Sequence, residues 1–173
     1  MGTTTLITGG ARSGKSAHAL TLAQHVPGER RFFIATAEAL DDEMRERIAH
    51  HRASRSADFA TIEEPIAISA ALLDLANRAD VVVVDCLTLW ISNLLMTRRS
   101  DEEILTEARG LASTMAGAPF ASIVVTDEVG AGIVPDNAMA RRFRDLLGWT
   151  NQAIAQTAEH VVLMVAGYPM RVK

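Results

Sequence analysis

A glycine-rich stretch near the amino terminus constrains the fold more than any other part of the sequence. It runs from Gly9 to Ser16 and reads Gly-Gly-Ala-Arg-Ser-Gly-Lys-Ser, which fits the P-loop pattern G-x-x-x-x-G-K-S/T. A β-branched run, Thr4–Thr8, precedes it, and a helix-forming run, Ala17–Gln24, follows it. Strand, glycine loop and helix in this order are the context that supports such a match. An incidental glycine-rich turn is the alternative, and these flanks argue against it.

The residue types in this stretch suit phosphate binding. Glycines let backbone N–H groups approach phosphate oxygens closely, and the following helix presents its positive N-terminal end. We expect Lys15 to reach the β- and γ-phosphates of a nucleotide and the Ser16 hydroxyl to bind Mg²⁺. The stretch therefore predicts a nucleoside triphosphate site. Its expected phosphate-binding residues are Gly9, Gly10, Ala11, Arg12, Ser13, Gly14, Lys15 and Ser16.

Short apolar or β-branched runs alternate with helix-like stretches along the rest of the chain. Further strands are expected at Phe32–Thr36, Val81–Asp85, Ser122–Thr126 and Val161–Val165. Further helices are expected at Asp42–Ala53, Ile68–Asn77, Leu89–Met96, Glu102–Met115 and Ala138–Ala158. Strands separated by helices indicate a parallel sheet covered on both faces. Ligands bind such sheets at the carboxyl ends of the strands, so residues just after each strand are candidates for function.

Length and composition are those of an ordinary globular domain. Its 173 residues contain no linker-like segment, which predicts one domain spanning 1–173. The net charge of −4 provides no basic footprint, so we expect no nucleic-acid partner. Cys86 is the only cysteine, which excludes an internal disulfide and suits the cytoplasm. We find no signal-peptide pattern and no apolar run of membrane-spanning length.

Carboxylates supply the next candidates. Asp85 ends the apolar run Val81–Asp85, where a P-loop protein can use a carboxylate to accept a hydrogen bond from Ser16 or from Mg²⁺-bound water. Capping of the next helix is the alternative role for Asp85, and the two roles are compatible. Glu63 and Glu64 fall in an expected loop between the second and third strands. They are candidates for binding a ribose or base edge, or they are simply surface acids.

Two adjacent histidines follow the second strand. With the helical period of about 3.6 residues, His51 falls on the apolar stripe of the expected helix and His50 falls at its edge. A neutral imidazole is a competent nucleophile toward an α-phosphate. A hydrogen-bonded core histidine is the alternative for His51. Arg52 and Arg55 are candidates for neutralising phosphate charge, or they belong to a solvated basic turn.

Several longer motifs accompany the P-loop. They are Asp-Asp-Glu-Met…Arg-Ile…His, Asp-Cys-Leu-Thr-Leu-Trp…Asn-Leu-Leu (85–95), Glu-Val-Gly-Ala-Gly-Ile-Val-Pro (128–135) and Arg-Phe-Arg-Asp…Gly…Asn-Gln (142–152). Together they resemble the bifunctional adenosylcobinamide kinase/adenosylcobinamide-phosphate guanylyltransferase family of cobalamin biosynthesis. The resemblance runs nearly end to end. With the strand order, it leads us to expect an α/β fold, a P-loop NTPase (RecA-like) three-layer sandwich with a mostly parallel central sheet.

The resemblance implies a two-step reaction. ATP or GTP would phosphorylate adenosylcobinamide, and GMP from GTP would then pass through a guanylylated histidine to give adenosylcobinamide-GDP. The histidine of the family motif maps to His51, so the implied catalytic residues are His51 and Lys15. The implied metal ligands for Mg²⁺ are Ser16 and Asp85. Beyond the P-loop, the implied nucleotide contacts are Ala35, Thr36, Ala37, Arg52, Ala53, Ser54, Arg55, Glu63 and Asp85.

The resemblance also implies a homotrimer and a corrinoid substrate. One departure from the family pattern is Asp127, where members often have asparagine, and the extra carboxylate changes the local charge. Two other functions stay open at this point. One is a simple small-molecule P-loop kinase, and the other is a RecA-like ATPase or nucleotide switch that acts on a protein partner. A covalent GMP adduct on incubation with GTP would separate the three.

Overall fold

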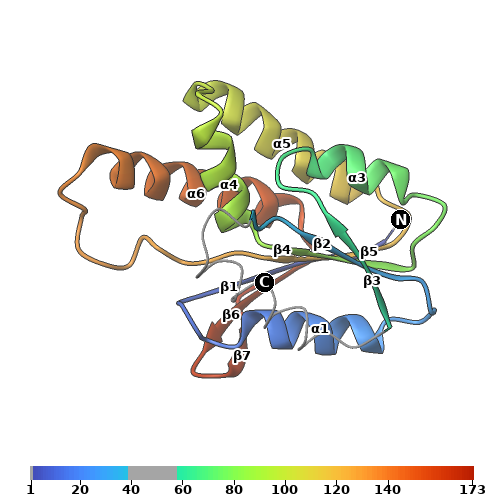
Figure 1. Cartoon of the computed structure of the whole chain (residues 1–173). Helices are drawn as coiled ribbons and strands as arrows, with labels where there is room; N and C mark the ends of the chain where they lie inside the picture. Colours follow the sequence, from blue (N-terminus) through green and yellow to red (C-terminus); the bar gives the residue numbers. More distant parts are fainter. Residues whose placement is uncertain (1, 39–57) are drawn as a thin grey trace.

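The computed structural model describes residues 2–38 and 58–173 (Figure 1). These residues form a seven-stranded sheet with the spatial order β3-β2-β4-β5-β1-β6-β7. The strands are β1 (Thr4–Gly9), β2 (Arg31–Ala35), β3 (Phe59–Glu63), β4 (Val81–Asp85), β5 (Ala121–Val125), β6 (His160–Val165) and β7 (Tyr168–Arg171). Strands β1 to β6 pair in parallel, and β7 pairs antiparallel with β6. The sheet is therefore mostly parallel, as the sequence predicts.

Helices cover both faces of the sheet. The described helices are α1 (Lys15–His25), α3 (Ile68–Asp74), α4 (Leu87–Met96), α5 (Asp101–Gly117) and α6 (Ala138–Thr157). In Figure 1, α1 lies on one face and the other four lie on the opposite face. The expected α/β fold, a mostly parallel central sheet between two layers of helices, is confirmed. The expected helix Asp42–Ala53 lies outside the described residues. None of the helices in the described part of the chain is long and apolar enough to cross a membrane.

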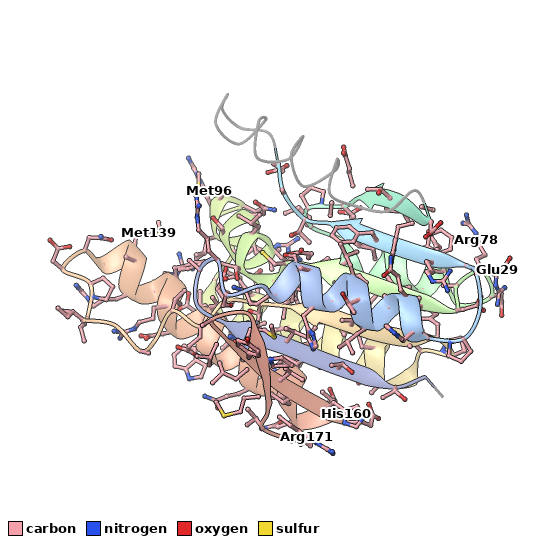
Figure 2. The ribbon with its side chains drawn as sticks, turned by 90° about the horizontal axis from the view of Figure 1, so that it is seen from below. Glu29, Arg78, Met96, Met139, His160 and Arg171 are labelled. Carbon is pink, nitrogen blue, oxygen red and sulfur yellow. The ribbon has the colours of Figure 1, made fainter. Side chains whose placement is uncertain are left out.

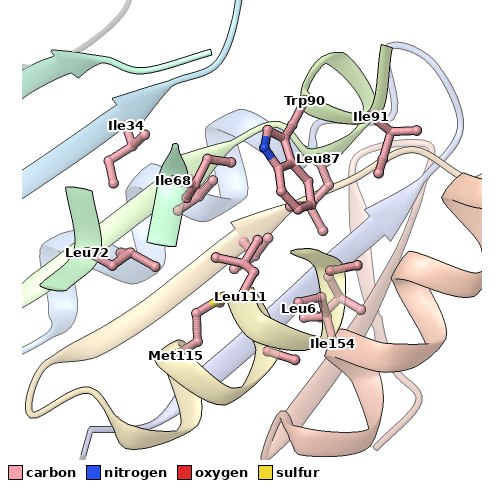
Figure 3. Packing of buried hydrophobic residues seen from close by; sticks show 14 of the residues in the cluster. Leu6, Ile34, Ile68, Leu72, Leu87, Trp90, Ile91, Leu111, Met115 and Ile154 are labelled. Atoms are coloured by element: carbon pink, nitrogen blue, oxygen red, sulfur yellow. The ribbon is translucent and has the colours of Figure 1, made fainter. Parts of the chain in front are cut away.

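The central strands explain why the core has two halves. Alternate side chains of a strand point to opposite faces, and in β4 Val82 and Val84 join the larger cluster under α3 to α6, whereas Val81 and Val83 join the smaller cluster under α1. All four valines are fully buried. Figure 3 shows the larger cluster, in which Trp90 of α4 packs with side chains of α5, α6 and the sheet. Because β4 is buried on both faces, its residues Val81 to Val84 form an unbroken apolar run.

Two edge strands were not predicted from the sequence. The stretch around Glu63 was expected to be a loop, but Glu63 is the last residue of β3. That expectation was wrong because β3 lies at a sheet edge, where Phe59 is its one buried residue and the apolar signal is weak. All four residues of β7 are exposed, and Pro169 within it suits an edge strand, where a missing N–H breaks no interior ladder.

Most predicted boundaries agree with the structure to within two residues. Helix α1 begins at Lys15 rather than at Ala17, because Gly14 caps it in the left-handed conformation. Helix α3 ends at Asp74, where the sequence predicts helix to Asn77. Helix α5 begins with a capping box, in which the Ser100 side chain and the Glu103 side chain each accept a hydrogen bond from the other residue's backbone N–H.

Candidate active site

The register of the sheet brings several predicted site residues to one edge. Ala35 of β2 is the Cα partner of Glu63 in β3 and of Asp85 in β4. Asp85 pairs with Val125 of β5, which pairs in turn with Ile7 of β1. These residues therefore form one row across the carboxyl ends of five parallel strands. The P-loop starts two residues beyond Ile7, so it opens at the same edge.

The P-loop backbone has the shape that its glycines predict. Gly9 has a φ of 150° and Gly14 a φ of 94°, both in the region that favours glycine. A Cβ atom on Gly9 would lie 2.6 Å from the Met164 carbonyl oxygen, so a side chain does not fit there. Gly14 is the N-cap of α1 and supplies no side-chain hydrogen bond to it. The first N–H groups of α1 therefore point toward the loop, where an anion would bind.

Lys15 points back across this loop. Its side chain is 8% exposed, and its Nζ donates a hydrogen bond to the Gly10 carbonyl oxygen at 2.6 Å. The same Nζ lies 2.7 Å from Oδ1 of Asp127, which follows β5. From the sequence, Asp127 was expected only to change the local charge as a departure from the family pattern, and this ion pair was not predicted. The available signal was its place just after a strand, at the edge where ligands of parallel sheets bind.

Two neighbouring connections hold the loop in place. The Glu128 N–H, after β5, donates to the Gly9 carbonyl oxygen at 3.0 Å. The Gly167 N–H, in the turn between β6 and β7, donates to the Ser13 carbonyl oxygen at 3.1 Å. The P-loop is thus fixed on both sides by backbone hydrogen bonds from the strands that flank β1.

A second group of buried polar contacts joins the ends of β2 and β4. The Thr36 hydroxyl donates to the Cys86 carbonyl oxygen at 2.7 Å and accepts from the Cys86 N–H at 2.8 Å. Asn93 of α4 donates from its amide nitrogen to the carbonyl oxygens of Thr36, at 2.8 Å, and Pro65, at 3.1 Å. The Thr36 side chain therefore orients backbone at this edge. Asn93, which the site prediction did not include, ties the segment after β2 to the segment after β3.

The Cys86 thiol is neutral in this setting. Burial, together with the negative charges of Asp85 and, to a smaller extent, Asp127, raises its pKa to about 12. Since a thiol acts as a nucleophile only when deprotonated, Cys86 is not suited to covalent catalysis.

Other predicted residues are separated from the phosphate-binding loop or fall outside the description. Glu63 is exposed at the end of β3, four strands from β1. With about 4.8 Å between strands, it lies roughly 19 Å across the sheet from the P-loop strand, far from any bound phosphate. Ala37 is half-buried just after β2. His51 and its neighbours Arg52, Ala53, Ser54 and Arg55 lie outside the described residues, and their roles stay predictions.

The oxygen donors near the P-loop suit Mg²⁺. Ser16 supplies a hydroxyl in the first turn of α1, and Asp85 supplies a carboxylate at the end of β4. Mg²⁺ is usually held by one or two carboxylates together with substrate phosphates and waters. Within 2–38 and 58–173, no group of three or more His, Cys, Asp or Glu side chains could hold a metal ion. A magnesium site here would therefore need phosphate oxygens to complete it.

A cavity of about 530 Å³ lies at the opposite, amino edge of the sheet. Its lining includes Arg30 and Asp80, which form an ion pair, and contains none of the predicted site residues. Figure 2 labels Glu29 and Arg78 near that edge, at the other end of the molecule from Met96 and Met139. The cavity is therefore separate from the candidate active site.

The glycine loop after β1, the buried Lys15 at the start of α1 and the carboxylate at the end of β4 define a P-loop nucleotide-binding protein. The family model for cobinamide kinase / cobinamide phosphate guanyltransferase matches residues 5–172. The chain belongs to this family, and it is therefore an enzyme, a kinase and guanylyltransferase of cobalamin biosynthesis. The resemblance described from the sequence is confirmed.

Individual relatives agree with the family. A bifunctional adenosylcobalamin biosynthesis protein, CobP, of Pseudomonas aeruginosa is 45% identical over 168 residues, covering 97% of this chain and 96% of the relative. The CobU protein of Escherichia coli K12, described by the same function, is 37% identical over 180 residues, covering 97% and 98%. Among solved structures, a KaiC-like protein from Pyrococcus horikoshii gives a TM-score of 0.46 at 17% identity, covering 93% of this chain and 70% of that one.

Proposed function

We propose that this enzyme phosphorylates adenosylcobinamide with ATP or GTP and then transfers GMP from GTP, through His51, to give adenosylcobinamide-GDP. One observation carries the proposal. In a chain that matches the family from residue 5 to residue 172, the buried Lys15 and the half-buried Asp85 lie at the same edge of the sheet as the P-loop. This edge is where a parallel sheet binds its ligand.

In the kinase step, the corrinoid hydroxyl oxygen attacks the γ-phosphorus of the nucleotide. A P–O bond to the corrinoid forms, the bond to the leaving diphosphate breaks, and the hydroxyl proton is released. Phosphoryl transfer depends on positioning and on neutralising the charge of the phosphate oxygens. In our proposal the P-loop N–H groups from Gly9 to Ser16 position the phosphates, and Lys15 neutralises charge on the β- and γ-phosphates.

In the guanylyltransferase step, an imidazole nitrogen of His51 attacks the α-phosphorus of GTP. An N–P bond forms and pyrophosphate leaves. An oxygen of the corrinoid phosphate then attacks the same phosphorus, so that the N–P bond breaks and His51 is regenerated. Covalent catalysis of this kind divides one difficult transfer into two easier ones. Arg52 to Arg55, Ala35 to Ala37 and Glu63 would complete the nucleotide site in the same proposal.

Mg²⁺, held by Ser16, Asp85 and phosphate oxygens, would neutralise charge on the phosphates in both steps. We further propose that residues 1–173 form a single domain and that the enzyme is a cytoplasmic homotrimer. Family resemblance supports the trimer, and the single cysteine suits a reducing compartment. Light scattering of the purified protein would test the trimer, for which a mass of three chains is expected.

Intact-protein mass spectrometry after incubation with Mg²⁺ and GTP tests the histidine intermediate. We expect an acid-labile adduct of the mass of GMP in the wild type and in His50→Ala, and none in His51→Ala. His50→Ala is the matched control because it removes the adjacent imidazole. The kinase step, followed as phosphocorrinoid formation, should persist in folded His51→Ala because that step needs no histidine adduct.

Three results would contradict the proposal. Loss of both activities together in folded His51→Ala would assign His51 another role. An adduct that survives in His51→Ala but disappears in His50→Ala would show that His50, and not His51, is the nucleophile that carries GMP. GTP binding without any adduct in the wild type would leave a simple P-loop kinase or an ATPase.

A further inference from the structure

The ion pair between Lys15 and Asp127 is not used by the two reactions described above. Lys15 Nζ lies 2.7 Å from the Asp127 carboxylate and 2.6 Å from the Gly10 carbonyl oxygen. An ammonium group has three N–H donors, so these two contacts occupy most of its capacity. The Lys15 side chain is 8% exposed and that of Asp127 is 30% exposed, so solvent screens this pair less than a surface pair.

Asp127 is held beside the P-loop by its backbone. Its N–H donates to the Thr88 hydroxyl of α4 at 2.9 Å, and its carbonyl oxygen accepts from the Asn151 amide of α6 at 3.2 Å. The next N–H, of Glu128, donates to the Gly9 carbonyl oxygen at 3.0 Å. The carboxylate therefore extends from a fixed segment that is itself bonded to the first residue of the phosphate loop.

A bound triphosphate would approach the same ammonium group. In P-loop proteins the lysine contacts the β- and γ-phosphates, which are anions like the Asp127 carboxylate. Two anions that contact one ammonium group are only a few ångströms apart, where they repel each other unless one withdraws. Whether Asp127 stays or withdraws, its charge opposes triphosphate binding. Nucleotides that lack β- and γ-phosphates do not compete for Lys15 in this way.

We propose that Asp127 is a positioning residue that competes with the β- and γ-phosphates for Lys15. In the nucleotide-free enzyme it holds the ammonium group over the P-loop, and on nucleotide binding it yields Lys15 to the phosphates. After transfer it recaptures Lys15, which favours release of the diphosphate or pyrophosphate product. This inference rests on the role proposed above for Lys15, which is to bind the β- and γ-phosphates.

Isothermal titration calorimetry of the full chain with GTP and with GMP tests this role. In Asp127→Asn, which keeps the side-chain shape and an acceptor oxygen, we expect GTP to bind about tenfold more tightly, or about 1.4 kcal/mol. GMP affinity should change less than twofold. Asp127→Glu restores the charge and should return GTP affinity toward that of the wild type. Asp136→Asn, an equal change of charge at an exposed position of the same connection, should bind both nucleotides like the wild type.

Each other outcome overturns the proposal. Weaker GTP binding in Asp127→Asn would mean that the carboxylate preorganises Lys15 for the nucleotide. An equal increase in the affinity of Asp127→Asn for GTP and for GMP would indicate a general effect of charge and no competition at Lys15. If Asp127→Asn does not melt cooperatively, the titrations are made with Asp127→Ser, which removes the same charge. Lys15→Ala tests the P-loop role separately, since unchanged GTP affinity in that variant would refute the proposed phosphate site itself.

Discussion

Asn93 provides a direct test of how the candidate site is supported. It is a buried side chain on α4, and its amide nitrogen donates to two backbone carbonyl oxygens, those of Thr36 and Pro65. Asn93→Ala removes both hydrogen bonds at once. The two carbonyls belong to segments that leave β2 and β3, so this one amide contributes to their alignment at the carboxyl edge of the sheet.

The cost of Asn93→Ala follows from these contacts. Each hydrogen bond contributes about 1 kcal/mol net, and leaving the buried Thr36 carbonyl oxygen without its donor adds about 1 kcal/mol more. We therefore expect the free energy of unfolding to fall by about 3 kcal/mol. For a chain of this size each kcal/mol lowers the melting temperature by about 2–4 °C, so a decrease of about 6–12 °C is expected.

Urea denaturation followed by circular dichroism measures this loss. Ser92→Ala is the matched control, because Ser92 is the exposed neighbour on the same helix and should change stability by less than about 0.5 kcal/mol. A loss below 1 kcal/mol in Asn93→Ala would show that water or a shifted backbone satisfies the two carbonyls. The structural role given to Asn93 would then be wrong.

Two further predictions concern stability away from the site. Ser100→Ala removes the capping box of α5 and should cost about 1 kcal/mol of unfolding free energy in the same assay, and no loss would contradict the capping assignment. Hydrogen bonds from the Arg30 side chain and backbone lower the pKa of Asp80 from 3.8 to about 2. Because the folded-state pKa is the lower one, this stabilisation is complete above about pH 4 and is lost as the pH falls toward 2. Asp80→Asn should therefore flatten the loss of stability over that range in acid-unfolding experiments, and an unchanged slope would contradict the assignment.

The sequence predicts best those elements whose burial is uniform. The valines of β4 are buried on both faces, so an unbroken apolar run both identifies the strand and places it at the centre of the sheet. The edge strands β3 and β7 lack this signal because most of their side chains are exposed to solvent. Their pairing depends on backbone hydrogen bonds to β2 and β6, which any residue but proline can donate, so the residue types carry little information about it.

Some features of the candidate site could likewise be predicted from the sequence, and others could not. The P-loop was predictable because phosphate binding restricts its residue types and their spacing. The contacts of Lys15 with Asp127 and of Asn93 with Thr36 and Pro65 were not, because they depend on which strands and helices become neighbours. Strand order is set by packing of the whole sheet, and no local pattern records it. His51 stays a prediction, since it lies outside the described residues.

The position of β1 in the sheet has a consequence for biosynthesis of the enzyme. The strand that carries the P-loop is made before both of its neighbours in the sheet, because Thr4 pairs with Ser122 of β5 and Thr5 pairs with His160 of β6. More than a hundred residues separate β1 from each of these neighbours in the chain, and pairing between such distant segments closes slowly. A nascent chain that ends before β6 lacks the turn whose Gly167 holds Ser13. The phosphate site therefore gains its full set of backbone contacts only after β6 and the turn that follows it have been made.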